Sequence, residues 1–436
     1  MRQRSTAPAP RVDATPSLAL AILIAASLAS CASSPRGLRP GMSSEEAASA
    51  SEAILRDAGM TNYPSGPIQR LSMDGIAWTK RAIELIDGAE DYVLVASFLL
   101  TDHPNARAIL EAMAAARSRG VRVHLIVDSS SYYRAYPMSS IPEPAIIMEA
   151  RDLGIPVAEY NSIRGMRIFK LLGLLDRDHR KYWVVDGKVA ILGGQNVDWD
   201  SLRDANEGGC VDAMVEFSSA GAITEMRDSF IETWNSYSID RLDPDDFPVR
   251  DCPSSYRAWL VDQGKEKDGR VTAMFDAFYA RARSELVFVQ CYTYLSPSLT
   301  RRVEEAVKRG VKVDFILSGG HISERAEKGS YYCIADLIAA GARVFLYESP
   351  GGSLLHYKMV MADGELASIG SANYNWRSQA LERDISVIFE DPESLATIKA
   401  GLDEIRPYLR EVGPEEAAKY RGPSYLMYFL LMQVAG

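Results

Sequence analysis

The sequence predicts an α/β protein made of two duplicated halves, each an α/β sandwich with a mixed β-sheet. Its 436 residues are enough for two domain-sized units. Apolar runs of strand length alternate with stretches of helical length, which is typical of α/β sandwiches. The same order of elements occurs twice along the chain, so a duplication explains the organisation.

The first half begins with an apolar run at 92–98, which predicts a buried strand. A helix is expected at 106–119, and a second strand follows at 120–128. Another helix then leads to a short strand at 154–160. This alternation predicts strands that lie side by side with helices across their faces.

The second half repeats this order closely. Strands are expected at 286–292 and 310–317, with a helix at 298–308 between them, and a short strand at 341–347 completes the copy. Both second strands open with glycine, valine, a basic residue and valine. The correspondence therefore extends beyond composition to individual positions.

A polar stretch rich in Pro and Asp at 238–255 is the expected boundary between the copies. We place the first repeat at 71–245 and the second at 253–410. The mature N-terminus at 31–70 is expected to hold a tether and a short helix. An apolar tail at 411–436 closes the chain.

Residues 1–30 have the character of a signal peptide. Three arginines precede an apolar run at 18–28 that is short for a bilayer-spanning helix but suits a signal-peptide core. The run ends in Leu28-Ala-Ser-Cys31, which resembles a bacterial lipobox and predicts lipidation of Cys31. The alternative is an ordinary signal-peptide cleavage near this position, with Cys31 incidental. Because Ala32 follows the cysteine, the lipobox resemblance implies an outer-membrane lipoprotein that faces the periplasm.

The formal net charge is −10, and removing 1–30, which holds three Arg and one Asp, makes it −12. Proteins that bind nucleic acid normally present a basic surface to the phosphates. The acidic composition therefore argues against nucleic acid as the main partner.

Besides Cys31, the mature chain has four cysteines, which are Cys210, Cys252, Cys291 and Cys333. An oxidising compartment permits disulfides in any of three pairings, and buried free thiols are the other reading. The sequence shows no Cys-x-x-Cys or paired-histidine spacing, so no metal or other cofactor is expected. The apolar segment 425–432 either packs on the body or forms a membrane-facing or substrate-facing edge.

Each half carries the pattern His-x-Lys-x4-Asp, an Asn seventeen residues after the His, and a later acidic residue before another apolar run. The residues are His179, Lys181, Asp186, Asn196 and Asp212 in the first half, and His356, Lys358, Asp363, Asn373 and Asp384 in the second. We take all ten as candidate site residues. A four-part constellation that occurs twice is a specific signal.

The pattern suits phosphodiester chemistry. On a strand, His and Lys two residues apart point to the same face, so both can reach one phosphate. The lysines and asparagines can hold its non-bridging oxygens. One imidazole attacks phosphorus, while the other protonates the leaving oxygen and later takes a proton from the acceptor. The two histidines must therefore begin in opposite protonation states.

A carboxylate on the remote ring nitrogen would fix the tautomer of each histidine, and we assign this role to Asp212 and Asp384. Glu382 is a competing candidate in the second half. Because one phosphate must touch both motifs, the motifs are expected to meet on an internal pseudo-two-fold axis of a monomer.

These motifs resemble the phospholipase D superfamily over 74–391. The segments 356–378 and 178–196 are similar to cardiolipin synthases. The resemblance implies phospholipase D-type halves with the active site at their interface. It also implies that His179 is the nucleophile and His356 the acid and base, and that the aspartates of the His-x-Lys-x4-Asp motifs are often more structural than catalytic.

Two departures limit the resemblance: a lipobox replaces the usual membrane-spanning N-terminus, and Asp384 stands where Glu is common. The expected function is a phospholipase D-type phosphodiesterase or phosphatidyltransferase that acts on phospholipids, with water or an alcohol as acceptor. A periplasmic nuclease of the same superfamily is the alternative. A degenerate binding scaffold is a third class, disfavoured by two intact motifs.

Overall fold

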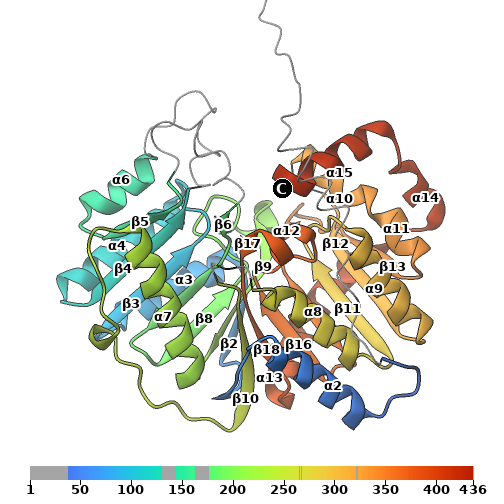
Figure 1. Ribbon diagram of the computed structural model, residues 1–436. Coiled ribbons are helices and arrows are strands. Elements are labelled where there is room, and N and C mark those ends of the chain that lie inside the picture. The colour runs from blue at the N-terminus through green and yellow to red at the C-terminus, as the bar shows by residue number, and fades with distance from the viewer. Residues whose placement is uncertain are drawn as a thin grey trace, which may run out of the picture.

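Two large β-sheets packed face to face form the centre of the molecule, and helices cover their outer faces (Figure 1). This computed structural model describes residues 38–129, 144–162, 176–264, 266, 268–320 and 323–435. The expected signal peptide at 1–30 and the lipidation candidate Cys31 lie outside these residues. The predicted class, two duplicated α/β sandwich halves with mixed sheets, is confirmed.

The first repeat supplies all but one strand of an eight-stranded sheet. In spatial order the strands are β14 (Leu354–Leu355), β9 (Cys210–Phe217), β8 (Val189–Gly193), β7 (Tyr182–Val185), β3 (Tyr92–Ser97), β4 (Arg122–Asp128) and β5 (Val157–Tyr160), and β2 (Arg70–Asp74) pairs with β9 beside this path. The outer face is covered by α3 (Gly75–Asp87), α4 (Pro104–Ser118) and α6 (Ala145–Asp152).

The second sheet has nine strands and repeats the same central order. They are β1 (Asn62–Ser65), β10 (Tyr256–Asp262), β18 (Ile385–Phe389), β16 (Leu366–Gly370), β15 (Met359–Ala362), β11 (Glu285–Gln290), β12 (Lys312–Ser318), β13 (Arg343–Tyr347) and β19 (Leu409–Glu411). The helices on its outer side are α8 (Arg270–Arg281), α9 (Pro297–Lys308), α10 (Glu324–Tyr332) and α11 (Ile334–Ala339).

The period of two along each strand divides the core into layers. In β3, Leu94 faces the core between the sheets, whereas Val93 and Val95 pack under α3 and α4. Phe217 of β9 meets Phe389 of β18 edge to face, with ring centroids 5.6 Å apart. The helices α7 (Ala220–Tyr237) and α13 (Pro392–Ile405) add apolar side chains to this central core.

The repeat order predicted from the sequence is confirmed. The strands expected at 92–98 and 286–292 are β3 and β11, and the helices expected at 106–119 and 298–308 are α4 and α9. The later strands of each copy are β4, β5, β12 and β13, with ends shifted by at most three residues. The stretch 238–255 connects α7 to β10 and contains only the short 3₁₀ helix η4 (Pro244–Asp246).

The N-terminal segment joins the second sheet rather than the first repeat. Its helix α2 (Ser44–Asp57) packs on α8, and β1 pairs antiparallel with β10. Ser43 and Glu46 form a capping box that starts α2, which lies within the segment where a short helix was expected.

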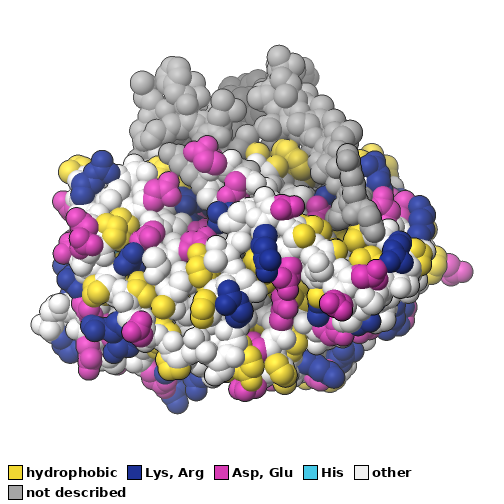
Figure 2. All heavy atoms as spheres, turned by 60° about the horizontal axis from the view of Figure 1, so that its bottom comes forward, with side chains coloured by type: hydrophobic (Ala, Val, Ile, Leu, Met, Phe, Trp, Pro, Cys, Tyr) yellow, Lys and Arg dark blue, Asp and Glu magenta, His cyan; other side chains and the backbone are white. Residues whose placement is uncertain are grey.

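The C-terminal tail folds into α14 (Pro414–Lys419) and α15 (Pro423–Ala435), which pack against α11 and α10. Phe429 of α15 is buried, whereas Leu426 and Met427 are exposed. Within the described part of the chain, no helix combines the length and apolar character needed to cross a membrane. Figure 2 shows a face of the molecule on which basic and acidic side chains are interspersed.

Candidate active site

Two short strand pairings interlock the repeats where the motifs begin. The strand β6 (Arg177–Asp178) runs parallel to β17 (Glu382–Arg383), and β14 runs parallel to the start of β9. As a result, the backbone N–H of His179 donates to the carbonyl of Arg383 at 3.0 Å. The N–H of His356 donates to the carbonyl of Val211 at 2.8 Å. Each histidine is thus fixed to the residue that precedes the acidic residue of the other repeat.

This register brings each histidine to a carboxylate of the opposite repeat. The Nδ1 atom of His179 lies 2.9 Å from Oδ1 of Asp384, and Nδ1 of His356 lies 2.5 Å from Oδ2 of Asp212. A carboxylate at this distance accepts the Nδ1 proton and leaves the Nε2 lone pair for attack or proton transfer. The two His–Asp pairs are therefore crossed between the repeats.

Both carboxylates are fully buried and held by further donors. Asp384 accepts the hydroxyl of Ser371 at 2.6 Å, and Asp212 accepts the backbone N–H of Ala213 at 2.7 Å. These bonds fix the carboxylates and hence the imidazole planes.

The motif lysines are buried beside the histidines. The Nζ atom of Lys181 donates to the carbonyl oxygen of His179 at 2.5 Å, and Lys358 bonds the carbonyl of His356 in the same way. The ring of Phe98 lies edge-on to His179, with centroids 4.8 Å apart, and the Lys181 ammonium lies 4.8 Å from the same ring. This contact orients the lysine and the histidine of one motif together.

Asn196 and Asn373 occupy matching positions. Their backbone N–H groups donate to the hydroxyls of Ser201 and Ser378 at 3.3 and 3.0 Å. The side-chain Oδ1 atoms of both asparagines are buried without a hydrogen-bond partner among the described residues. Buried polar atoms are normally paired, so these two amides are suited to a polar ligand.

Burial is the largest cause of the pKa shifts of both histidines, of Lys181 and of Asp384. It lowers the pKa of His179 well below the usual value, and the charge of Lys181 lowers it further. Burial and Lys358 also lower the pKa of His356, although Asp212 opposes them. Burial, followed by the charge of Lys358, lowers the pKa of Lys181 to about 7. Burial raises the pKa of the Asp384 carboxyl to about 6, against the Ser371 hydrogen bond and the Lys181 charge.

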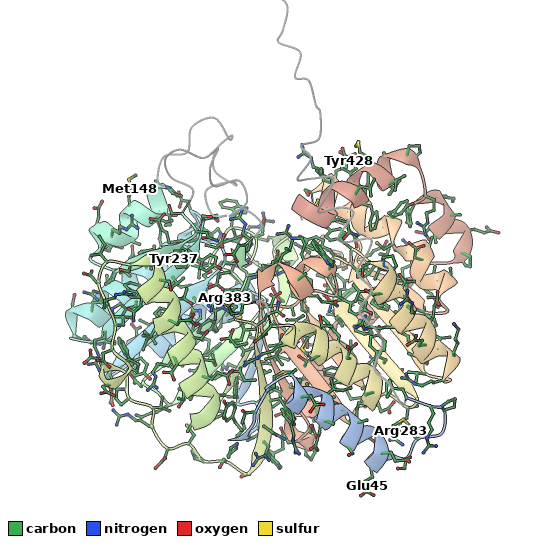
Figure 3. All side chains as sticks on the ribbon, in the orientation of Figure 1. Glu45, Met148, Tyr237, Arg283, Arg383 and Tyr428 are labelled. Atoms are coloured by element: carbon green, nitrogen blue, oxygen red, sulfur yellow. The ribbon has the colours of Figure 1, made fainter. Side chains whose placement is uncertain are left out.

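A buried polar network joins the repeats behind His179. The guanidinium of Arg180 donates to Asp178 at 2.7 Å, to Asp262 at 3.1 Å and to the hydroxyl of Thr233 at 3.1 Å. Arg383 donates to the same hydroxyl at 2.9 Å and lies between the two halves in Figure 3. Arg180 and Arg383, which are adjacent in sequence to His179 and Asp384, therefore both bond Thr233 of α7.

Asp186 and Asp363 are not brought to the histidines. Each follows its motif strand at a positive φ of 52°. Asp186 accepts the backbone N–H groups of residues 90–92, and Asp363 accepts those of residues 283–285. Five residue steps separate Lys181 from Asp186, or about 17 Å along an extended strand. The carboxylates of Asp186 and Asp363 therefore hold the chain at the start of β3 and β11.

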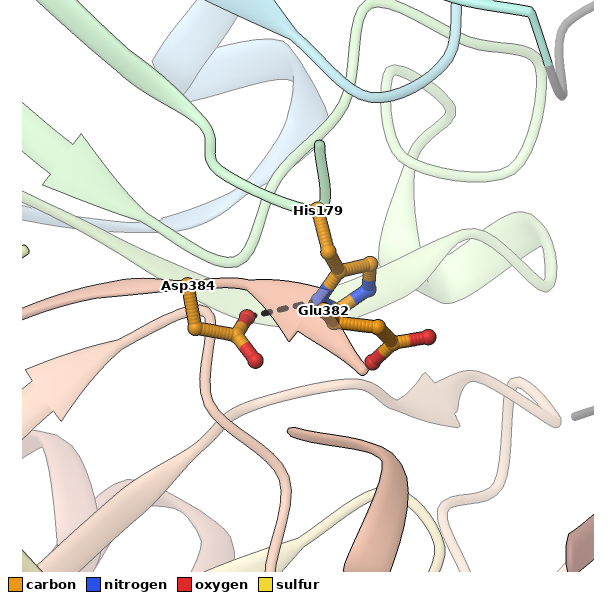
Figure 4. A group of neighbouring side chains, drawn as sticks. All are labelled: His179, Glu382 and Asp384. Atoms are coloured by element: carbon orange, nitrogen blue, oxygen red, sulfur yellow. Dashed lines mark hydrogen bonds and ion pairs between the residues drawn. The ribbon is translucent and has the colours of Figure 1, made fainter. Parts of the chain in front are cut away.

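Glu382 lies beside His179 but does not take the Nδ1 position, which belongs to Asp384. One oxygen from each carboxylate lies within 4.8 Å of a ring nitrogen of His179 and of each other (Figure 4). Such a group has the spacing of metal ligands, but the carboxylates already accept hydrogen bonds from Arg377 and Ser371. Phe98 belongs to no spacing in the motifs, so the sequence did not indicate it. Arg377 lies in the segment 356–378 that resembles cardiolipin synthases, but it was not among the ten candidate site residues.

The chain matches the family model described as cardiolipin synthase, PLD-like domain, over residues 82–234 and 278–406. These two segments cover both structural repeats and more than half of the chain. The chain therefore belongs to this family of the phospholipase D superfamily, as its motifs indicated.

Two curated relatives carry the name cardiolipin synthase A. The protein from Edwardsiella ictaluri is 29% identical over 298 residues, which are 66% of this chain and 58% of the relative. The protein from Salmonella arizonae is 30% identical over 311 residues, which are 69% of this chain and 61% of the relative. The chain thus spans about three-fifths of the length of these relatives.

A phosphatidylserine synthase from Haemophilus influenzae has a similar fold. Its crystal structure superposes with a TM-score of 0.64 and covers 88% of this chain and 99% of its own. Sequence identity is 13%, so this likeness describes the fold alone.

Proposed function

We propose that the chain is a phospholipase D-type phosphodiesterase or phosphatidyltransferase that acts on phospholipids. The observation that carries the proposal is the crossed pairing of His179 with Asp384 and of His356 with Asp212, beside two buried lysines. Membership of the cardiolipin synthase family and the names of the relatives support a phospholipid as the substrate.

In the proposed first step, the Nε2 lone pair of His179 forms a bond to phosphorus. The bond from phosphorus to the head-group oxygen breaks, and that oxygen takes a proton from His356. We assign His179 as the nucleophile because burial and Lys181 lower its pKa well below the usual value and favour the neutral ring. In His356 the charge and hydrogen bond of Asp212 oppose the lowering and favour the protonated ring that donates. Asp384 stabilises the imidazole as it becomes cationic.

In the second step, His356 takes a proton from the acceptor, whose oxygen attacks phosphorus and displaces His179. Water yields a phosphatidic acid, and an alcohol yields a new phospholipid. Lys181, Lys358 and the two site asparagines stabilise the non-bridging oxygens in both steps. These residues need no further group to balance the reaction.

We also propose that Cys31 carries lipid and holds the protein on the periplasmic face of the outer membrane. The support is the Leu28-Ala-Ser-Cys31 sequence after an apolar run. Mass spectrometry of the native protein is expected to find acyl chains on Cys31. A Cys31→Ala variant that still partitions fully with membranes, for instance through α15, would contradict the proposal.

The test of activity is to incubate the purified mature protein with mixed phospholipids, with and without glycerol, and identify products by mass spectrometry. We expect phosphatidic acid or a head-group-exchanged lipid, and neither product from His179→Ala. Single-stranded DNA serves as the second substrate, because the same superfamily chemistry could cleave it. Cleavage of DNA with no change in any lipid would overturn the proposal in favour of a nuclease.

A further inference from the structure

The pseudo-two-fold symmetry of the site is broken at one position that matters for charge. Glu382 pairs with Arg177, which stands two residues before His179. In the other half, Cys210 pairs with Leu354, which stands two residues before His356. Glu382 and Cys210 are therefore equivalent positions, but one bears a carboxylate and the other a thiol.

A second pair of equivalent positions, Phe98 and Cys291, also differs between the repeats. Phe98 follows β3 and packs on His179, whereas Cys291 follows β11. Cys291 and Cys210 pack together with Leu354 in a small buried cluster. His179 thus has an aromatic ring and an extra carboxylate near it, while the corresponding positions around His356 hold two thiols.

The Glu382 side chain is 7% exposed and forms an ion pair with Arg377. The guanidinium uses Nε and Nη2 to bond Oε1 alone, at 3.0 and 2.8 Å. The other oxygen, Oε2, has the Ser378 hydroxyl at 3.5 Å, which is a weak contact. Arg377 therefore fixes the carboxylate beside the imidazole without enclosing both oxygens.

The charge of Glu382 acts on His179 directly. It raises the pKa of His179, against the larger lowering by burial and Lys181, and so favours the cationic ring. When Nε2 bonds phosphorus while Nδ1 keeps its proton, the ring becomes a cation. A second carboxylate within 4.8 Å stabilises that cation more than the neutral ring.

We propose that Glu382 is a positioning residue that stabilises the cationic phosphohistidine on His179 and makes the two histidines unequal. The inference rests on the proposed function. Asp384 holds the tautomer, and Glu382 supplies an additional negative charge that Cys210, at the equivalent position beside His356, does not supply. The bond changes are those of the first proposed step: N–P forms, P–O breaks, and His356 protonates the leaving oxygen.

The experiment measures formation of the intermediate with a p-nitrophenyl ester of phosphatidic acid in detergent micelles. In wild-type protein, a burst of p-nitrophenol should report bond formation to His179. We expect Glu382→Gln to slow this burst by about 10- to 100-fold, because an ionic stabilisation is lost in a low-dielectric site. Glu382→Asp should recover part of the rate. Cys210→Ala, at the equivalent position, should change it by less than about threefold.

A second readout separates charge from structure. Removing the Glu382 charge should shift the acid limb of the kcat/KM profile to lower pH, because less negative charge remains to favour protonation of the His179–Asp384 pair. An unchanged burst rate in folded Glu382→Gln, or slowing confined to acceptor transfer, would overturn the inference. Absence of any burst and adduct in wild-type protein would instead refute the proposed function.

Discussion

The imidazole of His179 and the carboxylate of Asp384 are joined at 2.9 Å although the two residues are 205 positions apart in the sequence. The pairing follows from one backbone bond, in which His179 N–H donates to the carbonyl of Arg383, the residue before Asp384. The mirror arrangement joins His356 to Asp212 through Val211. The geometry of the site is therefore set by strand register across the repeat interface.

Removing either crossed carboxylate should impair turnover while the fold persists. We expect Asp384→Asn and Asp212→Asn to lower kcat by roughly 10²- to 10⁴-fold, because the remote ring nitrogen loses its charged acceptor and the tautomer is no longer fixed. The measurement is kcat on phospholipid micelles, with circular dichroism as the control for folding. A loss of less than tenfold in both variants would contradict the role of the pairs.

The His179→Ala and His356→Ala variants should lose different steps of the reaction. His356→Ala should still form an adduct with the p-nitrophenyl ester, because that leaving group departs without a proton, whereas His179→Ala should form none. Each single loss should lower turnover of natural lipid by several orders of magnitude. Trapping a labelled adduct and mapping its peptide decides the assignment, and label on His356 would reverse the two roles.

The rate of the first step should depend on pH in a bell-shaped manner. Below about 6 the Asp384 carboxyl gains a proton and no longer accepts from His179, so activity falls as pH decreases. Above about 7 Lys181 loses its proton and with it the positive charge at the phosphate, so activity falls as pH rises. The measurement is kcat/KM against pH at constant ionic strength, and the two limbs belong to coupled groups.

Ser371→Ala provides a directed test of the acid limb. The Ser371 hydroxyl donates to Asp384 and opposes the effect of burial, so its loss should raise the pKa of that carboxyl further. The acid limb should therefore move to higher pH. If the acid limb stays at the same pH in a Ser371→Ala variant that folds and binds lipid normally, that limb belongs to a group other than Asp384.

Asp186 and Asp363, the motif aspartates that lie away from the histidines, should contribute to the free energy of unfolding and not to the catalytic rate. Asp363 accepts three consecutive backbone N–H groups at a positive φ of 52°. We expect Asp363→Ala to lower the free energy of unfolding by about 3 kcal/mol, because charge-assisted bonds are lost and alanine is strained there. Asp363→Asn should cost less, since Asn tolerates this conformation and keeps an acceptor.

Denaturant unfolding measures this effect, and kcat per folded molecule should stay within about threefold of wild type. A large loss of kcat in stable Asp363→Asn would place this residue in the chemistry after all. The same pair of substitutions at Asp186 gives an independent comparison in the first repeat.

Much of the fold could be predicted because local patterns determine it. Apolar runs such as 92–98 become strands buried on both faces, and the repeated order identifies the duplication. The ten motif residues could likewise be read from spacing. The sequence did not indicate which acid serves which histidine, because that choice depends on pairing between distant strands.

Other features escaped prediction for the same reason. Phe98 reaches His179 through the placement of β3 beside β7, and β1 crosses from the N-terminal segment to the edge of the second sheet. Neither contact leaves a periodic or spaced signal in the chain. Glu382 and Asp384 are two residues apart, and only the register of β17 against β6 shows which one meets Nδ1.

The crossed acids also have a consequence for biosynthesis. When the first repeat leaves the ribosome, His179 is present but its acceptor Asp384 has not yet been made. A chain that ends before the second repeat therefore lacks the His179–Asp384 pair, which forms only when β17 docks on β6. Each His–Asp pair is thus a product of folding of the whole duplicated chain, because neither repeat alone holds a motif histidine together with its carboxylate.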